Sequence, residues 1–134
     1  MELKPVSPTA KAPAQNFTGD VYVNQVKAPD EPSRLIVGYV RFTPGARTNW
    51  HSHALGQTLH ATEGVGLVGG RDGTVIRMRA GDTVWTPPGE EHWHGGTEAT
   101  VMCHIAMLEE IEDGQTTTWL EPVTDEQYAA AQDR

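Results

Sequence analysis

The chain has 134 residues and carries 10 Lys and Arg against 18 Asp and Glu, a formal net charge of -8 at pH 7. This length has room for one domain of ordinary size with a single core. An acidic chain without a cluster of basic residues is not suited to nucleic acid or to an anionic membrane surface, because both select for clustered Lys and Arg. We therefore expect neither nucleic acid nor a membrane as a partner.

Cysteine usage and hydropathy indicate the compartment. Cys103 is the one cysteine of the sequence, so no intrachain disulfide can form and an oxidising compartment is not implied. No apolar run follows a charged start, and no apolar stretch is long enough to cross a bilayer. We expect a cytoplasmic protein in which Cys103 is buried and unreactive rather than a nucleophile.

Residues 1–16 contain three prolines among small and polar residues. This composition disfavours a helix and buries little surface. We predict an extended N-terminal arm over residues 1–16 and a single domain over residues 17–134. The arm either is loose or lies along a neighbouring subunit, and the sequence leaves both open.

A strand is predicted over residues 34–43, where the two faces differ. Arg41 belongs in solvent or at an interface, so the opposite face, with Gly38, Val40 and Phe42, is predicted to point inward. A glycine in the middle of a strand marks a β-bulge or a floor against which a ligand lies. Both interpretations of Gly38 stay open.

The rest of the chain alternates short strands with glycine and proline turns. Strands are predicted near residues 21–23, 51–53, 57–61, 75–78, 101–108 and 116–120. Thr124 with Gln127 fits a capping box for a short helix over residues 125–131. Many short strands and almost no helical period indicate an all-β sandwich or barrel.

Two blocks of the sequence carry the candidate ligands. His51 and His53 stand two residues apart, so on an extended strand their imidazoles project from one face. Gln57 follows four residues later, and His92 arrives in the second block. Three imidazoles and one amide oxygen can converge on one ion, and we predict a metal site with His51, His53, Gln57 and His92 as ligands. Nitrogen and oxygen donors suit Mn²⁺, Fe²⁺, Co²⁺, Ni²⁺ or Zn²⁺.

The same two blocks resemble the two motifs of the cupin family. The matching residues of the first are Gly45, His51, His53, Gln57 and Gly64, with Gln in place of the usual Glu, and those of the second are Gly81, Pro87, Gly89 and His92, with Gly96 in place of the usual Asn. The resemblance covers residues 21–120. It implies a cupin-type jelly-roll barrel with the metal inside, to which the predicted extended N-terminal arm and short C-terminal helix are added.

Within the cupins, the runs PGARTNWHSHALGQTL, HWHG and EPVTDEQY resemble small bacterial manganese-dependent hydroxynitrile lyases, which cleave or form (R)-mandelonitrile. The resemblance implies Mn²⁺ on the four ligands, His104 as a histidine of the pocket, and Gly38 and Val40 in the pocket wall. Phe42, inward on the same strand, and Leu108 complete the predicted substrate pocket. Leu108 departs from the pattern, because some members have a Gln there that can hydrogen-bond cyanide.

The predicted catalytic residues are His104 and His94. His104 lies in an apolar strand, where burial disfavours the charged form and suits the ring to act as a general base at neutral pH. The alternative is a structural histidine bonded to a backbone carbonyl. His94 stands two residues beyond His92, so on a regular strand we expect it to point into the same space; the alternative is a histidine at the rim or behind a metal ligand.

A neutral ligand set leaves a divalent ion its full charge, which favours Lewis-acid chemistry over redox chemistry. We predict a metal-dependent carbon–carbon lyase whose substrate is a cyanohydrin, or an aldehyde plus cyanide. Two alternatives stay open, an Fe(II)-dependent cupin dioxygenase acting on a small organic substrate and a non-catalytic cupin that binds a small molecule. We expect a homo-oligomer, either a dimer or a tetramer.

Overall fold

Apolar residues that alternate along short strands place those strands in two facing sheets. The computed structural model describes residues 1–133, and this part of the chain forms twelve strands and one helix. The elements are β1 (Ala10–Lys11), β2 (Phe17–Thr18), β3 (Val21–Lys27), β4 (Leu35–Phe42), β5 (Arg47–Thr48), β6 (His51–His53), β7 (Gln57–Gly70), β8 (Val75–Arg79), β9 (Thr83–Thr86), β10 (His92–Gly96), β11 (Met102–Glu109), β12 (Thr117–Trp119) and α1 (Asp125–Ala131).

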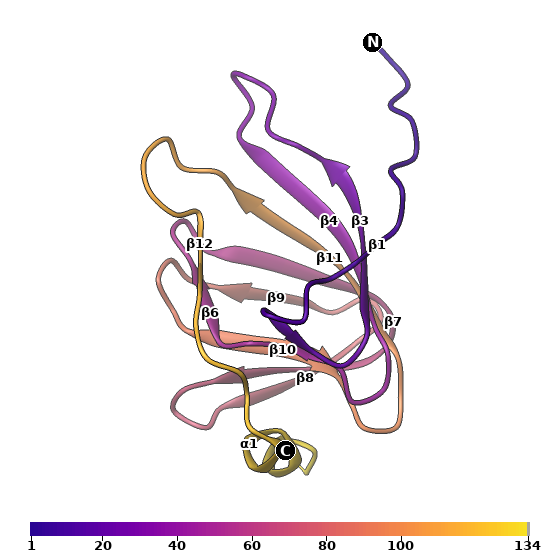
Figure 1. Cartoon of the computed structure of the whole chain (residues 1–134), viewed down its shortest axis with the longest axis vertical. Helices are drawn as coiled ribbons and strands as arrows, with labels where there is room; N and C mark the ends of the chain where they lie inside the picture. Colours follow the sequence, from indigo (N-terminus) through magenta and orange to yellow (C-terminus); the bar gives the residue numbers. More distant parts are fainter. Residues whose placement is uncertain (134) are drawn as a thin grey trace.

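The long strand β7 joins the two sheets. Its first half, up to Gly64, pairs with β11 and β9, and its second half, from Val65, pairs with β10 and β8. The strand order is β1-β3-β4-β11-β7-β10-β5-β2, with β6 and β12 added beside β10. In Figure 1 the ribbon of β3, β4 and β11 splays away from that of β8 and β10, and β7 runs between them. The predicted all-β jelly-roll class is confirmed.

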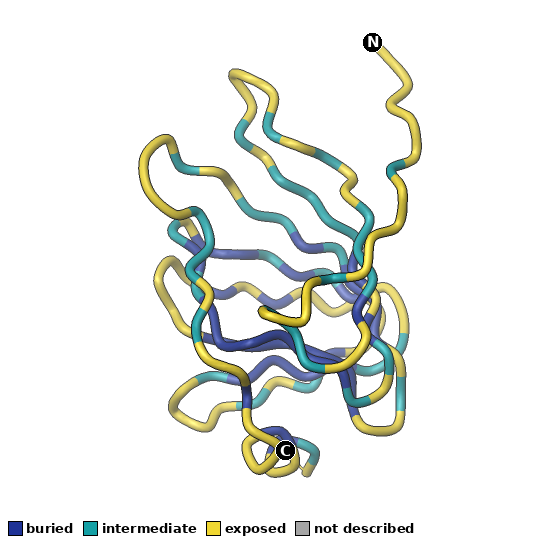
Figure 2. The backbone as a smooth tube through the Cα atoms, in the orientation of Figure 1, coloured by how far each residue is buried: buried dark blue, intermediate teal, exposed yellow. Residues whose placement is uncertain are grey.

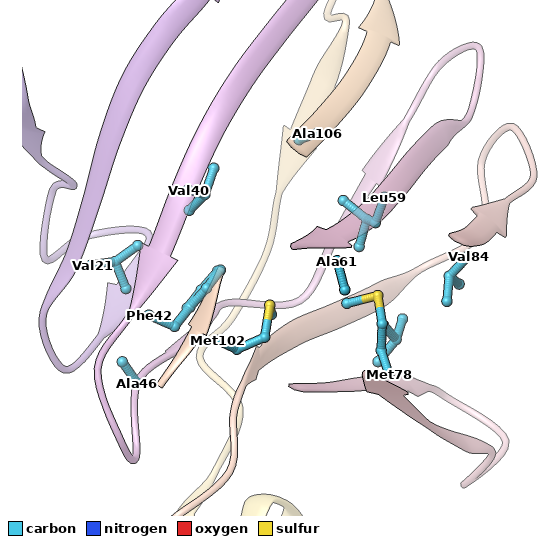
Figure 3. Close-up of a cluster of buried hydrophobic side chains, with 11 residues drawn as sticks. Val21, Val40, Phe42, Ala46, Leu59, Ala61, Met78, Val84, Met102 and Ala106 are labelled. Atoms are coloured by element: carbon cyan, nitrogen blue, oxygen red, sulfur yellow. The ribbon is translucent and has the colours of Figure 1, made fainter. Parts of the chain in front are cut away.

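The core lies between the two sheets. Its buried members come from strands of both sheets and from the turn after β4, as Figure 3 shows for most of them: Val21, Val40, Phe42, Ala46, Leu59, Ala61, Val68, Met78, Val84, Met102 and Ala106. Buried chain is concentrated in the middle of the molecule, and the hairpin tips and the N-terminal arm are exposed (Figure 2). The core includes Met102 and Ala106, which lie on either side of His104 along β11.

The C-terminal helix α1 begins where the sequence predicts. The Thr124 side chain accepts a hydrogen bond from the Gln127 backbone N–H, and the Gln127 side chain accepts one from the Thr124 N–H. Buried Arg47 donates to the Val123 carbonyl and to Asp125. The helix covers a second apolar cluster on the outside of the sheet: Trp50, Leu67, Trp93, Val123, Tyr128 and Ala131.

The structure refines two expectations about the chain's course. Within the expected arm, Ala10 and Lys11 form β1 and pair with β3. The strand predicted near residues 57–61 is longer than expected, because β7 runs through Gly64 without a break to Gly70. Cys103 is buried as expected. No helix within residues 1–133 is long and apolar enough to span a membrane.

Two glycines of the first motif differ in what surrounds them, and this generates a stability prediction. Gly45 (φ +86°) has open space where a Cβ would sit, whereas a Cβ on Gly64 (φ +75°) would lie 1.8 Å from the Val101 carbonyl oxygen. Gly45→Ala should cost about 1–2 kcal/mol of unfolding free energy from backbone strain alone. Gly64→Ala should cost clearly more, because β7 must also move away from β11.

Urea unfolding of the two variants and the wild type measures both costs. The explanation is wrong if Gly64→Ala destabilises the protein no more than Gly45→Ala does.

Candidate metal centre

Three histidines from two neighbouring strands meet inside the barrel. His51 and His53 project from one face of β6, and His92 of β10 is the cross-strand partner of His51. Their ring centroids are 4.3 Å apart for His51 and His92, 4.9 Å for His51 and His53, and 5.4 Å for His53 and His92. One nitrogen from each lies within 4.8 Å of the other two, and all three side chains are buried. This group could hold a metal ion.

Hydrogen bonds on the outer ring nitrogens set the direction of the lone pairs. His51 Nδ1 is 2.9 Å from the Asn49 carbonyl oxygen, and His92 Nδ1 is 3.0 Å from the Glu90 carbonyl oxygen. A carbonyl can only accept, so each Nδ1 carries the proton and each neutral ring keeps its lone pair on Nε2. His53 Nδ1 is held by the Thr117 hydroxyl at 3.1 Å.

Gln57 brings a fourth donor to the same place. It is buried at the start of β7, and its Oε1 lies 3.3 Å from His92 Nε2. Because His92 carries its proton on Nδ1, its Nε2 and the amide oxygen are both acceptors, with no proton between them. His53 Nε2 is also buried without a hydrogen-bond partner among residues 1–133. Converging acceptors of this kind fit a divalent cation.

Burial keeps the three imidazoles neutral. It lowers the pKa of His53 to about 4, with a further contribution from nearby His92. Burial lowers the pKa of His51 well below its ordinary value and also lowers that of His92. At neutral pH all three rings can therefore offer lone pairs to an ion without first releasing a proton.

The two predicted catalytic histidines form a hydrogen-bonded pair next to this group. His104 Nε2 lies 3.1 Å from His94 Nδ1, so one proton is shared between these two atoms. The His94 ring centroid is 5.1 Å from that of His51, and Phe42 packs against both rings of the pair. The remaining nitrogens, His94 Nε2 and His104 Nδ1, are buried and have no partner within the described chain. The pair thus offers one free acceptor and one free donor.

The predicted pocket residues lie along the inner face of β4 and β11. Val40 pairs with His104, and Leu108 lies further along β11, opposite Ile36. Val40 and Phe42 are buried, whereas Gly38 and Leu108 are half-buried toward the splayed end of the sheet. Val40 and Phe42 therefore lie beside His104, Gly38 and Leu108 lie further along the two strands, and contact of the four residues with a substrate stays a prediction.

Gly38 lies opposite a β-bulge of the neighbouring strand. The irregularity in this part of the sheet is in β3, between Gln25 and Lys27, while β4 pairs with β11 in continuous register. A Cβ on Gly38 would meet its nearest neighbours at 3.9–4.0 Å, an ordinary contact distance. Gln25 is the cross-strand partner of Gly38, so the bulge in β3 lies directly opposite this glycine, as one of the two interpretations expects, while the ligand-floor interpretation stays a prediction.

Two features of the site have no clear signal in the sequence. Trp119 of β12 lies over the His51 ring at a centroid distance of 4.7 Å, and Thr117 holds His53. The alternation of residues 116–120 predicts a strand, but the local pattern does not show that it pairs with β6.

A cavity of about 550 Å³ lies between β8 and β9, and His92 forms part of its wall together with Val84 and Thr86.

Comparisons with known proteins agree with this geometry. The family model described as cupin domain matches residues 38–108. The chain is 45% identical over 130 residues to an (R)-mandelonitrile lyase of Granulicella tundricola, covering 96% of this chain and 98% of the relative.

Two solved structures share the fold. A cupin-like protein from Thermotoga maritima superposes with a TM-score of 0.86 at 34% identity, covering 98% of this chain and 97% of that one. A cupin-2 domain protein from Rhodospirillum rubrum superposes with a TM-score of 0.71 at 14% identity, covering 96% and 83% of the two chains, and this likeness concerns the fold alone.

Burial of His104 predicts an acid-sensitive fold. Burial lowers the pKa of His104 from its ordinary value of 6.5 to about 4, so between these values the unfolded chain binds a proton that the folded chain does not. The free energy of unfolding should therefore fall as pH is lowered from about 6.5 toward 4, at up to about 1.4 kcal/mol per pH unit for this group. In His104→Gln the decline should be shallower.

The measurement is urea unfolding of metal-free wild type and His104→Gln at several pH values across this window. Parallel curves for the two proteins would show that His104 takes no part in the acid sensitivity.

Proposed function

The chain belongs to the cupin family, and we propose that it is a metal-dependent hydroxynitrile lyase that cleaves or forms (R)-mandelonitrile. The observation that carries this proposal is the convergence of His51, His53, His92 and Gln57 beside the buried pair His94 and His104. The 45% identity to an (R)-mandelonitrile lyase over nearly the whole chain supports it. The proposed products of cleavage are an aldehyde and HCN.

We propose His51, His53, Gln57 and His92 as the ligands and Mn²⁺ as the ion. All four donors are neutral, so a bound divalent ion supplies a full positive charge that stabilises the developing alkoxide oxygen of the cyanohydrin. Gln57 matters because a carboxylate at its position would cancel one unit of that charge. The protein's part is to hold the donors in place and to exclude water around them.

The proton-transfer step is assigned to the histidine pair. We assign the proton between His104 Nε2 and His94 Nδ1 to His104, which leaves a lone pair on His104 Nδ1. The hydroxyl proton moves to this atom, and the bond between the carbinol carbon and the nitrile carbon breaks. The carbonyl group of the aldehyde forms, and cyanide departs with the bonding electrons, takes the proton back from His104 and leaves as HCN, which restores the neutral base. His94 accepts the hydrogen bond that holds His104 in the required tautomer.

The substrate pocket is assigned to the inner face of β4 and β11. We expect the aromatic ring of the substrate to lie beside His104 against Gly38 and Val40, with buried Phe42 at the inner end. Leu108 has no group that can hydrogen-bond to cyanide, so the leaving group must be stabilised elsewhere. We expect this substitution to reduce efficiency relative to lyases that carry Gln at this position.

We also propose one cupin domain per chain and a homo-oligomer, a dimer or tetramer, as the working assembly. Apolar side chains of the N-terminal arm are almost fully exposed, Leu3 at 97% and Val6 at 95%. Trp85, on the outer face of its sheet, is 55% exposed. Exposed apolar surface of this kind is common where subunits meet.

Removal of one ligand tests the metal centre. His53→Ala should weaken Mn²⁺ binding by more than the roughly 10–100-fold lost when an outer partner of a ligand is removed. Elemental analysis of dialysed protein, followed by Mn²⁺ titration, measures the loss. The matched control is His60→Ala, because His60 is bonded to Thr83 at 2.9 Å rather than to the cluster. Equal affinity in the two variants would exclude His53 as a ligand.

Removal of the proposed base tests the reaction. His104→Ala should keep its metal but lose ~10²–10⁴-fold in kcat/KM on (R)-mandelonitrile, the usual contribution of a general base. Cleavage is followed as benzaldehyde release, with metal content measured on the same sample. Undiminished turnover would rule out His104 as the base. Oxygen uptake dependent on Fe(II), without cyanohydrin cleavage, would favour a dioxygenase instead.

A further inference from the structure

An arginine outside the histidine cluster links the chain segments that carry two of its members. Arg71 lies just after β7, next to Gly70, which is the cross-strand partner of His92. Its Nε donates to Glu91 Oε1 at 2.8 Å, and its two terminal nitrogens donate to the two oxygens of Glu121 at 2.9 Å each. Its guanidinium carbon lies 4.0 Å from the ring centroid of Trp50.

Two of the three partners of Arg71 directly precede candidate ligands in the chain. Glu91 immediately precedes His92, and Trp50 immediately precedes His51. The Glu121 carbonyl accepts a hydrogen bond from the Trp50 N–H at 3.0 Å, so this carboxylate belongs to the segment that pairs with the histidine strand. One guanidinium therefore spans the segments leading into β6 and β10.

We infer that Arg71 is a positioning residue that holds His51 and His92 at the spacing needed for a common ion. This inference rests on the proposed metal centre. In the metal-free protein the lone pairs of the two rings face each other, and their repulsion favours a wider separation. The Arg71 contacts tie the preceding residues together from the outside and oppose that separation.

The geometry differs from that of an ordinary surface ion pair. Single exposed pairs contribute little, but a bidentate Arg–carboxylate pair that is part of a network is the recognised exception. Arg71 combines such a pair with a second carboxylate and with the face of an indole ring. Lysine cannot reproduce the two-nitrogen fork.

The sign of the effect separates positioning from simple electrostatics. Arg71→Ala removes a positive charge near the cluster, which by Coulomb's law alone would strengthen the binding of a cation. If Arg71 instead positions the two histidines, Arg71→Ala should lower the affinity for the cation. Arg71→Lys keeps the positive charge and loses the two-nitrogen fork. If only the charge matters, the affinity for the cation should not change; if Arg71 positions the histidines, the affinity should again fall.

The test is Mn²⁺ titration of metal-free wild type, Arg71→Ala, Arg71→Lys and Arg34→Ala. Arg34→Ala is the matched control, because Arg34 also holds a carboxylate, Glu112 at 2.6 Å, and bonds to neither histidine strand in the described chain. We expect roughly tenfold or more loss of affinity in Arg71→Ala, a smaller loss in Arg71→Lys and none in Arg34→Ala. The visible spectrum of the Co²⁺-loaded proteins should change with Arg71 alone, because its band intensities report ligand geometry.

Wild-type affinity in both Arg71 variants, or an equal loss in Arg34→Ala, would overturn the inference and leave the proposed function standing. Wild type that binds no metal would instead remove the proposed metal centre, and the inference with it. Arg71→Lys keeps the test decisive if the alanine variant does not fold.

Discussion

The site depends on hydrogen bonds that turn the lone pairs of three neutral imidazoles toward one point. Carbonyl oxygens of Asn49 and Glu90 hold the protons of His51 and His92 on the outer nitrogens, so the inner nitrogens cannot donate. Burial keeps the rings uncharged. Acceptors gathered in this way, with the oxygen of Gln57, are costly to bury unless a cation or a proton lies between them.

The fold supplies this arrangement through strands that cross between sheets. Strand β7 begins at Gln57 beside the cluster, passes through Gly64 into the other sheet, and ends next to Arg71. One end of β7 therefore provides the Gln57 oxygen inside the barrel. The other end leads directly to Arg71, whose side chain contacts residues next to His51 and His92. Gly64 of the first motif therefore serves the path of the chain, whereas the histidines of the motifs serve as candidate ligands.

The donor set also limits the chemistry that the proposed centre can perform. Three imidazoles and one amide add no negative charge, so polarisation of a bound oxygen is favoured over electron transfer. The neighbouring pair of His94 and His104 supplies a proton acceptor in a place where burial lowers the pKa of both rings. The proposed ligands lie on β6, β7 and β10, and the proposed base His104 lies on β11.

The sequence by itself determined the all-β class, the positions of β3, β4, β6, β8, β11 and β12, the capping box of α1 and the identity of the four candidate donors, because period, turn residues and motif spacing are local properties. The tertiary structure decided that β12 pairs with β6, that β7 is continuous, and that Arg71 lies over Trp50. These contacts join residues far apart in the chain, and their geometry depends on how the sheets curl. The tautomers of the histidines were likewise set by backbone carbonyls, whose direction no residue type specifies.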